Sequence, residues 1–135
     1  MWELLLSLIE QHVRILAEIM VITERIRIQC QEGLITEVAN ESENRQRIIN
    51  ILSGVQEKIE RLLATISFRD GDKEKIDQLK LWQLNFNKMV EAVNEVDQNI
   101  LEILERDKNE TSRQIAAIFK SKESFRGYNL LSVKK

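Results

Sequence analysis

One stretch decides the fold: residues 79–103, which read LKLWQLNFNKMVEAVNEVDQNILEI. Large apolar side chains recur there at steps of three and four residues, at Leu79, Trp82, Phe86, Met89, Val93, Val96, Ile100 and Ile103. This spacing matches the 3.6 residues of a helical turn. The stretch therefore predicts a long amphipathic helix with one side against a core.

The apolar stripe stops after this stretch and then resumes. Residues 105–114 contain no large apolar side chain, whereas Ile115, Ile118 and Phe119 follow directly. Because Leu104 and Ile115 lie eleven residues apart, about three turns, the stripe resumes on the same side of the helix. We expect one helix over residues 73–120, whose last part projects beyond the core as an arm. A new helix start near Thr111 is the alternative.

Two further amphipathic segments precede this helix, over residues 3–32 and 35–67. Gly33 could end the first as a left-handed C-cap, or Asn40 with Glu43 could open the second as a capping box. We favour a turn at Gly33, because it gives two helices of similar length, which bury more surface when they lie antiparallel.

The clearest turn in the chain is RDGDK, at residues 69–73. Gly71 and its flanking aspartates favour a reversal of the chain, and Asp72 is a suitable N-cap for the helix that follows. With no proline and four glycines in 135 residues, little else interrupts helix formation. The chain is predicted to be all-α.

The predicted architecture is a single domain over residues 1–135, an antiparallel three-helix bundle with long helices and an extended C-terminal helical arm. Residues 121–135 lack a sustained apolar period and are expected to form a flexible tail. This tail holds the apolar residues Phe125, Tyr128, Leu130 and Leu131.

Charge and cysteine content narrow the class of partners. The net charge is -2, with 20 basic and 22 acidic residues mixed along the chain, so neither nucleic acid nor an anionic membrane is an expected partner. Charged residues interrupt each apolar run well before the length of a membrane span, and Glu3 does not suit a secretory signal. The single cysteine excludes an internal disulfide and favours the cytoplasm.

The sequence offers no pattern for catalysis, a metal or a cofactor. His12 is the only histidine and Cys30 the only cysteine, too few for a zinc site or a di-iron helical bundle. His12 lies within the apolar stripe of the first helix, so we expect a buried, neutral residue, and Cys30 is expected to be a small core residue. The protein is predicted not to be an enzyme, and a bundle enzyme or metal carrier is the less favoured reading.

Apolar residues beyond the core requirements indicate a partner surface. A helix with apolar residues at i, i+3, i+4 and i+7 could lie in a groove between the second and third predicted helices. The residues of this chain that are predicted to anchor the partner helix are Ile51, Leu63, Leu104, Ile115, Ile118 and Phe119. The arm residues among them could equally form an intramolecular lid or a dimer contact.

Two stretches resemble the flagellar export chaperones of the FliT-like family, which handle the filament-cap protein. They are residues 22–52, ITERIRIQCQEGLITEVANESENRQRIINIL, and residues 96–128, VDQNILEILERDKNETSRQIAAIFKSKESFRGY. The shared elements are the turn Glu32-Gly33, the triplet Arg47-Ile48-Ile49, and a helix that passes through a charged stretch to a lysine-rich end and Tyr128.

The resemblance implies a small cytoplasmic helical protein that binds the C-terminal helical segment of the filament-cap protein, prevents its premature assembly and delivers it to the export apparatus and its ATPase. It also implies a compact, separate last helix, from which the predicted long third helix departs. The export chaperones of the hook-filament junction proteins are similar helical proteins, and they are an alternative family. The main alternative is a structural coiled-coil or adaptor protein that forms a homodimer through its long helices.

Overall fold

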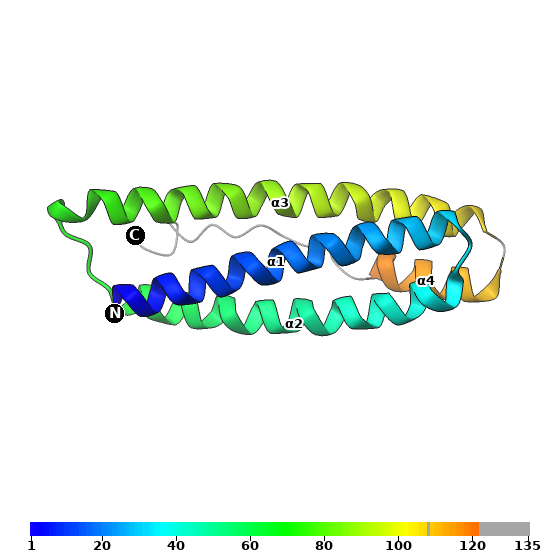
Figure 1. Cartoon of the computed structure of the whole chain (residues 1–135), viewed down its shortest axis with the longest axis horizontal. Coiled ribbons are helices and arrows are strands. Elements are labelled where there is room, and N and C mark those ends of the chain that lie inside the picture. Colours follow the sequence, from blue (N-terminus) through cyan, green and yellow to red (C-terminus); the bar gives the residue numbers. More distant parts are fainter. Residues whose placement is uncertain (108, 122–135) are drawn as a thin grey trace.

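Figure 1 shows the computed structural model of the chain, which describes residues 1–107 and 109–121. The helices are α1 (Trp2–Gln31), α2 (Ile35–Thr65), α3 (Lys73–Arg106) and α4 (Glu110–Ser121), and the described part of the chain holds no strand. The prediction of an all-α bundle is confirmed. The long helices run antiparallel in sequence order, and α1 packs against both α2 and α3 (Figure 1).

The turn between α1 and α2 lies at Gly33, as predicted, and not at Asn40, which is within α2. Gly33 has a φ of 74°, in the left-handed region that glycine adopts without strain. The Leu34 N–H donates to the Gln29 carbonyl at 2.9 Å, and the Gly33 N–H donates to the Cys30 carbonyl at 3.1 Å. These two bonds form a Schellman motif, which satisfies the last carbonyl groups of α1.

The second predicted turn is also present, as a short 3₁₀ helix at Asp70–Asp72 directly before α3. Asp72 is the N-cap residue of α3 by position, but its carboxylate accepts the Arg69 N–H at 2.9 Å. The side chain of Asp72 therefore closes the turn and does not cap the free N–H groups of α3.

The expected single helix over residues 73–120 is wrong, because α3 ends at Arg106 and α4 begins at Glu110. Short polar side chains cap the break. Asp107 accepts the Asn109 N–H at 3.0 Å and the Ser112 hydroxyl at 2.9 Å, which lowers the pKa of Asp107, and Asn109 accepts the Thr111 N–H at 2.8 Å. Aspartate and asparagine favour such caps over helix interiors.

The expected projecting arm is also absent, since α4 folds back and lies against α3 and α2 (Figure 1). Ile115 and Ala116 of α4 are each only 5 % exposed, and Ser112 is fully buried. Burying an isoleucine side chain stabilises by about 1.5 to 3 kcal/mol, which a helix projecting into water would forgo. Of the predicted tail, Ser121 is the last residue of α4, and residues 122–135 lie outside the described residues.

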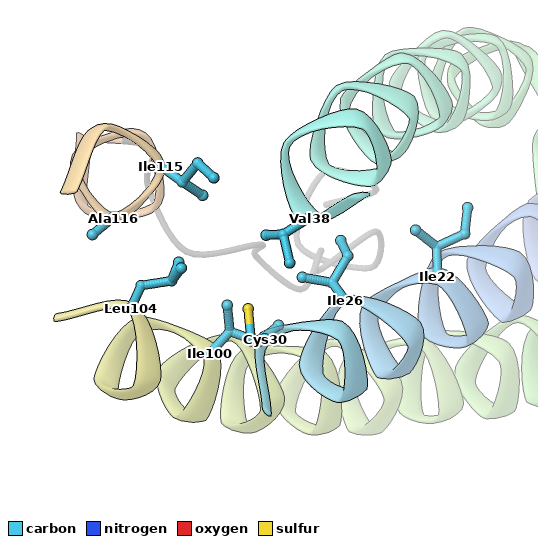
Figure 2. Packing of buried hydrophobic residues seen from close by; sticks show 8 residues of the cluster. All are labelled: Ile22, Ile26, Cys30, Val38, Ile100, Leu104, Ile115 and Ala116. Carbon is cyan, nitrogen blue, oxygen red and sulfur yellow. The ribbon is translucent and has the colours of Figure 1, made fainter. Parts of the chain in front are cut away.

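The apolar core runs along the whole bundle and ends at α4. In the half that holds the N-terminus, the buried residues come from α1, α2 and α3: Leu5, Leu8, Val55, Ile59, Leu63, Leu79 and Trp82. In the opposite half all four helices contribute, as Figure 2 shows, with the buried residues Ile22, Ile26, Cys30, Val38, Ile100, Leu104, Ile115 and Ala116. The fourth helix thus completes one end of the core.

Candidate functional site

A groove lies where α2, α3 and α4 meet. Although α1 packs closely against α2 and α3, these two helices make few close backbone contacts with each other, and α4 lies against both at one end. The groove has a volume of about 920 Å³ and is open to solvent. Its lining includes the apolar or partly apolar side chains Ala39, Ile49, Val93, Leu101, Ile115, Ile118 and Phe119.

Arg45 joins three helices beside this groove. Its Nη1 donates to Asp97 Oδ1 of α3 at 2.6 Å and to Thr23 Oγ1 of α1 at 3.0 Å. The Thr23 hydroxyl, which is buried, donates in turn to the Ile19 carbonyl at 2.7 Å. Because charge-assisted hydrogen bonds are stronger than neutral ones, Arg45 fixes α2 relative to both other long helices at this level.

Arg45 and Asp97 are mostly buried, with side-chain exposures of 11 % and 20 %. Burial raises the pKa of Asp97, and the hydrogen bond and positive charge of Arg45 oppose this rise. A charge pair at this depth costs desolvation, which its mutual attraction and further hydrogen bonds offset only in part. Its position sets the geometry of the groove wall.

Two cationic contacts hold α4 in place at the groove. The Arg45 guanidinium lies 5.1 Å from the centre of the Phe119 ring, within the range of a cation–π interaction. Lys120 forms an ion pair with Glu105 of α3 at 3.4 Å, and both side chains are about half exposed. The second contact contributes little, because water screens exposed ion pairs. Phe119 and the buried Ile115 therefore provide most of the attachment.

Three of the predicted partner anchors line the groove: Ile115, Ile118 and Phe119. Ile118 is 48 % exposed and Phe119 is half-buried, so both leave apolar surface exposed to solvent, whereas Ile115 belongs to the core. The structure thus brings the α4 residues to a groove between α2 and α3, as expected, although through a separate helix.

The other three predicted anchors lie elsewhere. Leu63 and Leu104 are 4 % and 1 % exposed and belong to the core, which removes them from the surface that a partner could contact. Ile51 is 58 % exposed but does not line the groove. Helical spacing alone does not distinguish residues that face the core from residues beside them that face solvent.

Arg45 and Asp97 were missed by sequence reasoning, although a signal was present. Arg45 lies three and seven residues before Ile48 and Leu52, on the apolar side of α2. Asp97 likewise falls between Val93 and Ile100 at steps of four and three. Opposite charges at seam positions of two helices predict a buried pair, because a lone charge there would be costly.

The lone histidine and cysteine are core residues, as predicted. His12 is fully buried and packs edge-on against the rings of both Trp82 and Phe86, at centroid distances of 5.0 and 4.7 Å. Burial lowers the pKa of His12 to about 4, and the Gln56 side chain only partly opposes this shift. Burial also raises the pKa of Cys30 to about 11. Neither side chain lines the groove.

The groove combines polar and apolar lining side chains. Its polar lining consists of amide, hydroxyl and charged side chains, and its apolar part comes from α3 and α4 as well as α2. Among the described residues no three His, Cys, Asp or Glu side chains are grouped to hold a metal ion. No helix within that part of the chain is long and apolar enough to cross a membrane.

Comparison with known proteins identified no relative. No protein-family model, curated protein or solved structure matches this chain.

Proposed function

We propose that the protein is a cytoplasmic export chaperone whose groove binds an amphipathic helix at the C-terminus of a flagellar filament-cap protein. The observation that carries this proposal is the open groove between α2, α3 and α4, in which Ile118 remains 48 % exposed beside Phe119 and Leu101. A client helix would bury this apolar surface together with its own apolar stripe, which would otherwise promote aggregation.

The resemblance supports this proposal on one further point. It implies a compact, separate last helix, and α4, with 12 residues, is the last helix among the described residues. In the proposed sequence of events, the chaperone keeps the client helix from assembling early and releases it at the export apparatus, where the export ATPase is the next partner. The proposal assigns no catalytic step to the protein.

The test compares two substitutions of matched size and exposure. Ile118 in the groove is 48 % exposed, and Leu84 on α3, outside the groove lining, is 51 % exposed. We expect Ile118→Asp to weaken binding of the client segment at least about tenfold, because a carboxylate would be desolvated in an apolar contact. Leu84→Asp should leave the affinity unchanged.

The measurement is titration of the full chain with the C-terminal helical segment of a filament-cap protein, and separately with that of a hook-filament junction protein. Circular dichroism of both variants checks that the bundle is intact. Binding of neither segment, or equal loss in the two variants, would contradict the proposal. Preference for the junction segment would reassign the client within the same class.

A structural protein that forms a homodimer is the second candidate, because α1 also exposes apolar side chains. Val13, Val21 and Ile28 are 50 %, 58 % and 45 % exposed, and spacings of eight and seven residues place them within about 80° around the helix. A stripe of this kind suits contact with a second helix. Light scattering would show a dimer that Val21→Asp dissociates, and a monomer at all concentrations would remove this candidate.

A further inference from the structure

The two flanks of α3 differ in chemistry. On one flank, the half-buried residues beside the core are apolar: Met89, Val96 and Ile103. At about 100° per residue, Asn94 and Gln98 lie on the opposite flank, which lines the groove. The chain thus closes one flank of α3 with apolar contacts and leaves amide side chains on the flank at the groove.

The facing wall of α2 is polar at the same level. Because Arg45 bonds Asp97 and the two helices run antiparallel (Figure 1), residues close to Arg45 on α2 lie level with residues close to Asp97 on α3. Four residues of the groove lining within about one turn of this pair form a polar strip, which we define as Ser42, Gln46, Asn94 and Gln98.

The polar strip has hydrogen-bonding capacity for a bound helix. Each amide side chain carries two N–H groups and a carbonyl oxygen with two lone pairs, more than one partner can fill. Gln46 donates to Asn50 Oδ1 at 3.0 Å. The Ser42 Oγ atom is shielded from solvent and has no hydrogen-bond partner among the described residues. An apolar helix laid over the strip would displace water from the amides without replacing the hydrogen bonds of that water.

Charge does not select the partner of this groove. The mostly buried ion pair beside it is neutral, and Lys120 is paired with Glu105 outside the lining. The other two charged residues of the lining, Glu43 and Arg47, have opposite signs and lie four residues apart on α2. These charges cancel, so neither an acidic nor a basic helix is attracted at long range.

We propose that the groove selects a helix whose apolar stripe is interrupted by an asparagine or glutamine, which hydrogen-bonds to the polar strip. The apolar residues of that helix contact Leu101, Ile118 and Phe119 beside the strip. The proposal rests on the proposed function, because it specifies which helices the client groove accepts. A single amide at a packed position is known to fix the register of neighbouring helices, and here it sets the position of the client along the groove.

Three helical peptides test this selection on the full chain. They share leucines at positions i, i+3 and i+7 of one stripe and carry glutamine, leucine or glutamate at position i+4. We expect the glutamine peptide to bind at least about fivefold more tightly than either other peptide, because it satisfies the strip without burying a charge. The hydrophobic effect alone predicts that the leucine peptide binds most tightly. Titration calorimetry measures the affinities, and that second order would overturn the proposal.

Substitutions in the strip should reverse the preference. In the double variant Asn94→Leu and Gln98→Met, the leucine peptide should bind more tightly than the glutamine peptide, because α3 no longer offers amides. The matched control, Gln78→Met and Asn85→Leu at exposed positions of α3 outside the groove lining, should keep the original order. Circular dichroism checks the folding of each variant. If the double variant does not fold, Gln98→Met alone, at an exposed position, should at least halve the preference. An unchanged preference in the folded strip variant would overturn the proposal.

The filament-cap segment separates this inference from the proposed function. We expect its affinity to fall roughly fivefold in the folded strip variant and to stay constant in the matched control. If the segment binds the strip variant and the unsubstituted chain equally, selection by amides is rejected and the proposed function stands. If the glutamine peptide shows the preference but no filament-cap segment binds, the proposed client is wrong and the selection stands. Binding of no peptide and no segment would reject both.

Discussion

The cores of the two halves of the bundle are packed with different kinds of side chains. In the half that holds the N-terminus, His12, Trp82 and Phe86 form an aromatic cluster among aliphatic residues of three helices. In the opposite half, the long helices are joined by the Arg45–Asp97 pair, and a fourth helix completes the core. The groove described above lies in the second half, where α2, α3 and α4 line it. We therefore expect the half with the aromatic cluster to contribute more to stability, and the half with the groove to carry the proposed binding.

Removal of an aromatic ring tests the stabilising half and should have the largest effect. Phe86 is 3 % exposed and stacks on Trp82 with the ring planes 8° apart. Phe86→Ala should lower the free energy of unfolding by about 3 to 5 kcal/mol, because it leaves a cavity in a packed core. Ile118→Ala in the groove should change it by less than about 0.5 kcal/mol. Urea unfolding followed by circular dichroism measures both, and similar losses would show that the halves are not divided in this way.

Acid should destabilise the protein through the same half. The pKa of His12 is about 4 in the folded chain and 6.5 ordinarily, so the unfolded chain binds the proton more readily between these values. The stabilising effect of neutral His12 is complete above pH 6.5 and is lost as the pH falls towards 4, by roughly 3 kcal/mol in total. Unfolding measured across this range should show the decline, and His12→Leu should remove that part of it. An unchanged pH profile in the variant would contradict the assignment.

Loss of the buried carboxylate tests the other half and should have a smaller, more local effect. Asp97→Ala leaves Arg45 without its ionic partner at 11 % exposure, which should cost about 2 kcal/mol. Because Arg45 also lies against Phe119, we expect Asp97→Ala to speed hydrogen exchange, relative to the unsubstituted protein, more in α4 than in the N-terminal half of α1. The double variant Arg45→Met and Asp97→Ala should regain much of the stability, since no unpaired charge remains. If the double variant were less stable than the Asp97→Ala variant, the Arg45–Asp97 pair would be a major source of stability.

The long helices could be predicted because their signals are local and repetitive. The stripe from Leu79 to Ile103 and the glycine at position 33 each act through their own helix or turn, and both predictions are confirmed. The break between α3 and α4 was harder to predict because two tendencies compete there. The apolar phase of Leu104 and Ile115 favours a continuous helix, while Asp107 and Asn109 favour caps, and the burial of Ile115 decides for the break.

The groove could be predicted only in part. Ile115, Ile118 and Phe119 were recognised because they are surplus to a three-helix core, and they do line the groove. Leu63 and Leu104 were misplaced because helical spacing does not fix which side of a helix faces its neighbours. The role of Arg45 depends on Thr23, Asp97 and Phe119, which are separated widely in sequence and meet only after folding.

The turn at Gly33 has a consequence for how the protein assembles. A turn of only three residues between α1 and α2, and another short break between α3 and α4, make two helical hairpins whose internal contacts are local in sequence. Local contacts form quickly, whereas the docking of α3 on α1 joins distant segments and is the slower step. Because the groove has walls from both hairpins, neither hairpin forms it alone. The groove would therefore be the last part of the molecule to form during folding and the first to be lost on partial unfolding.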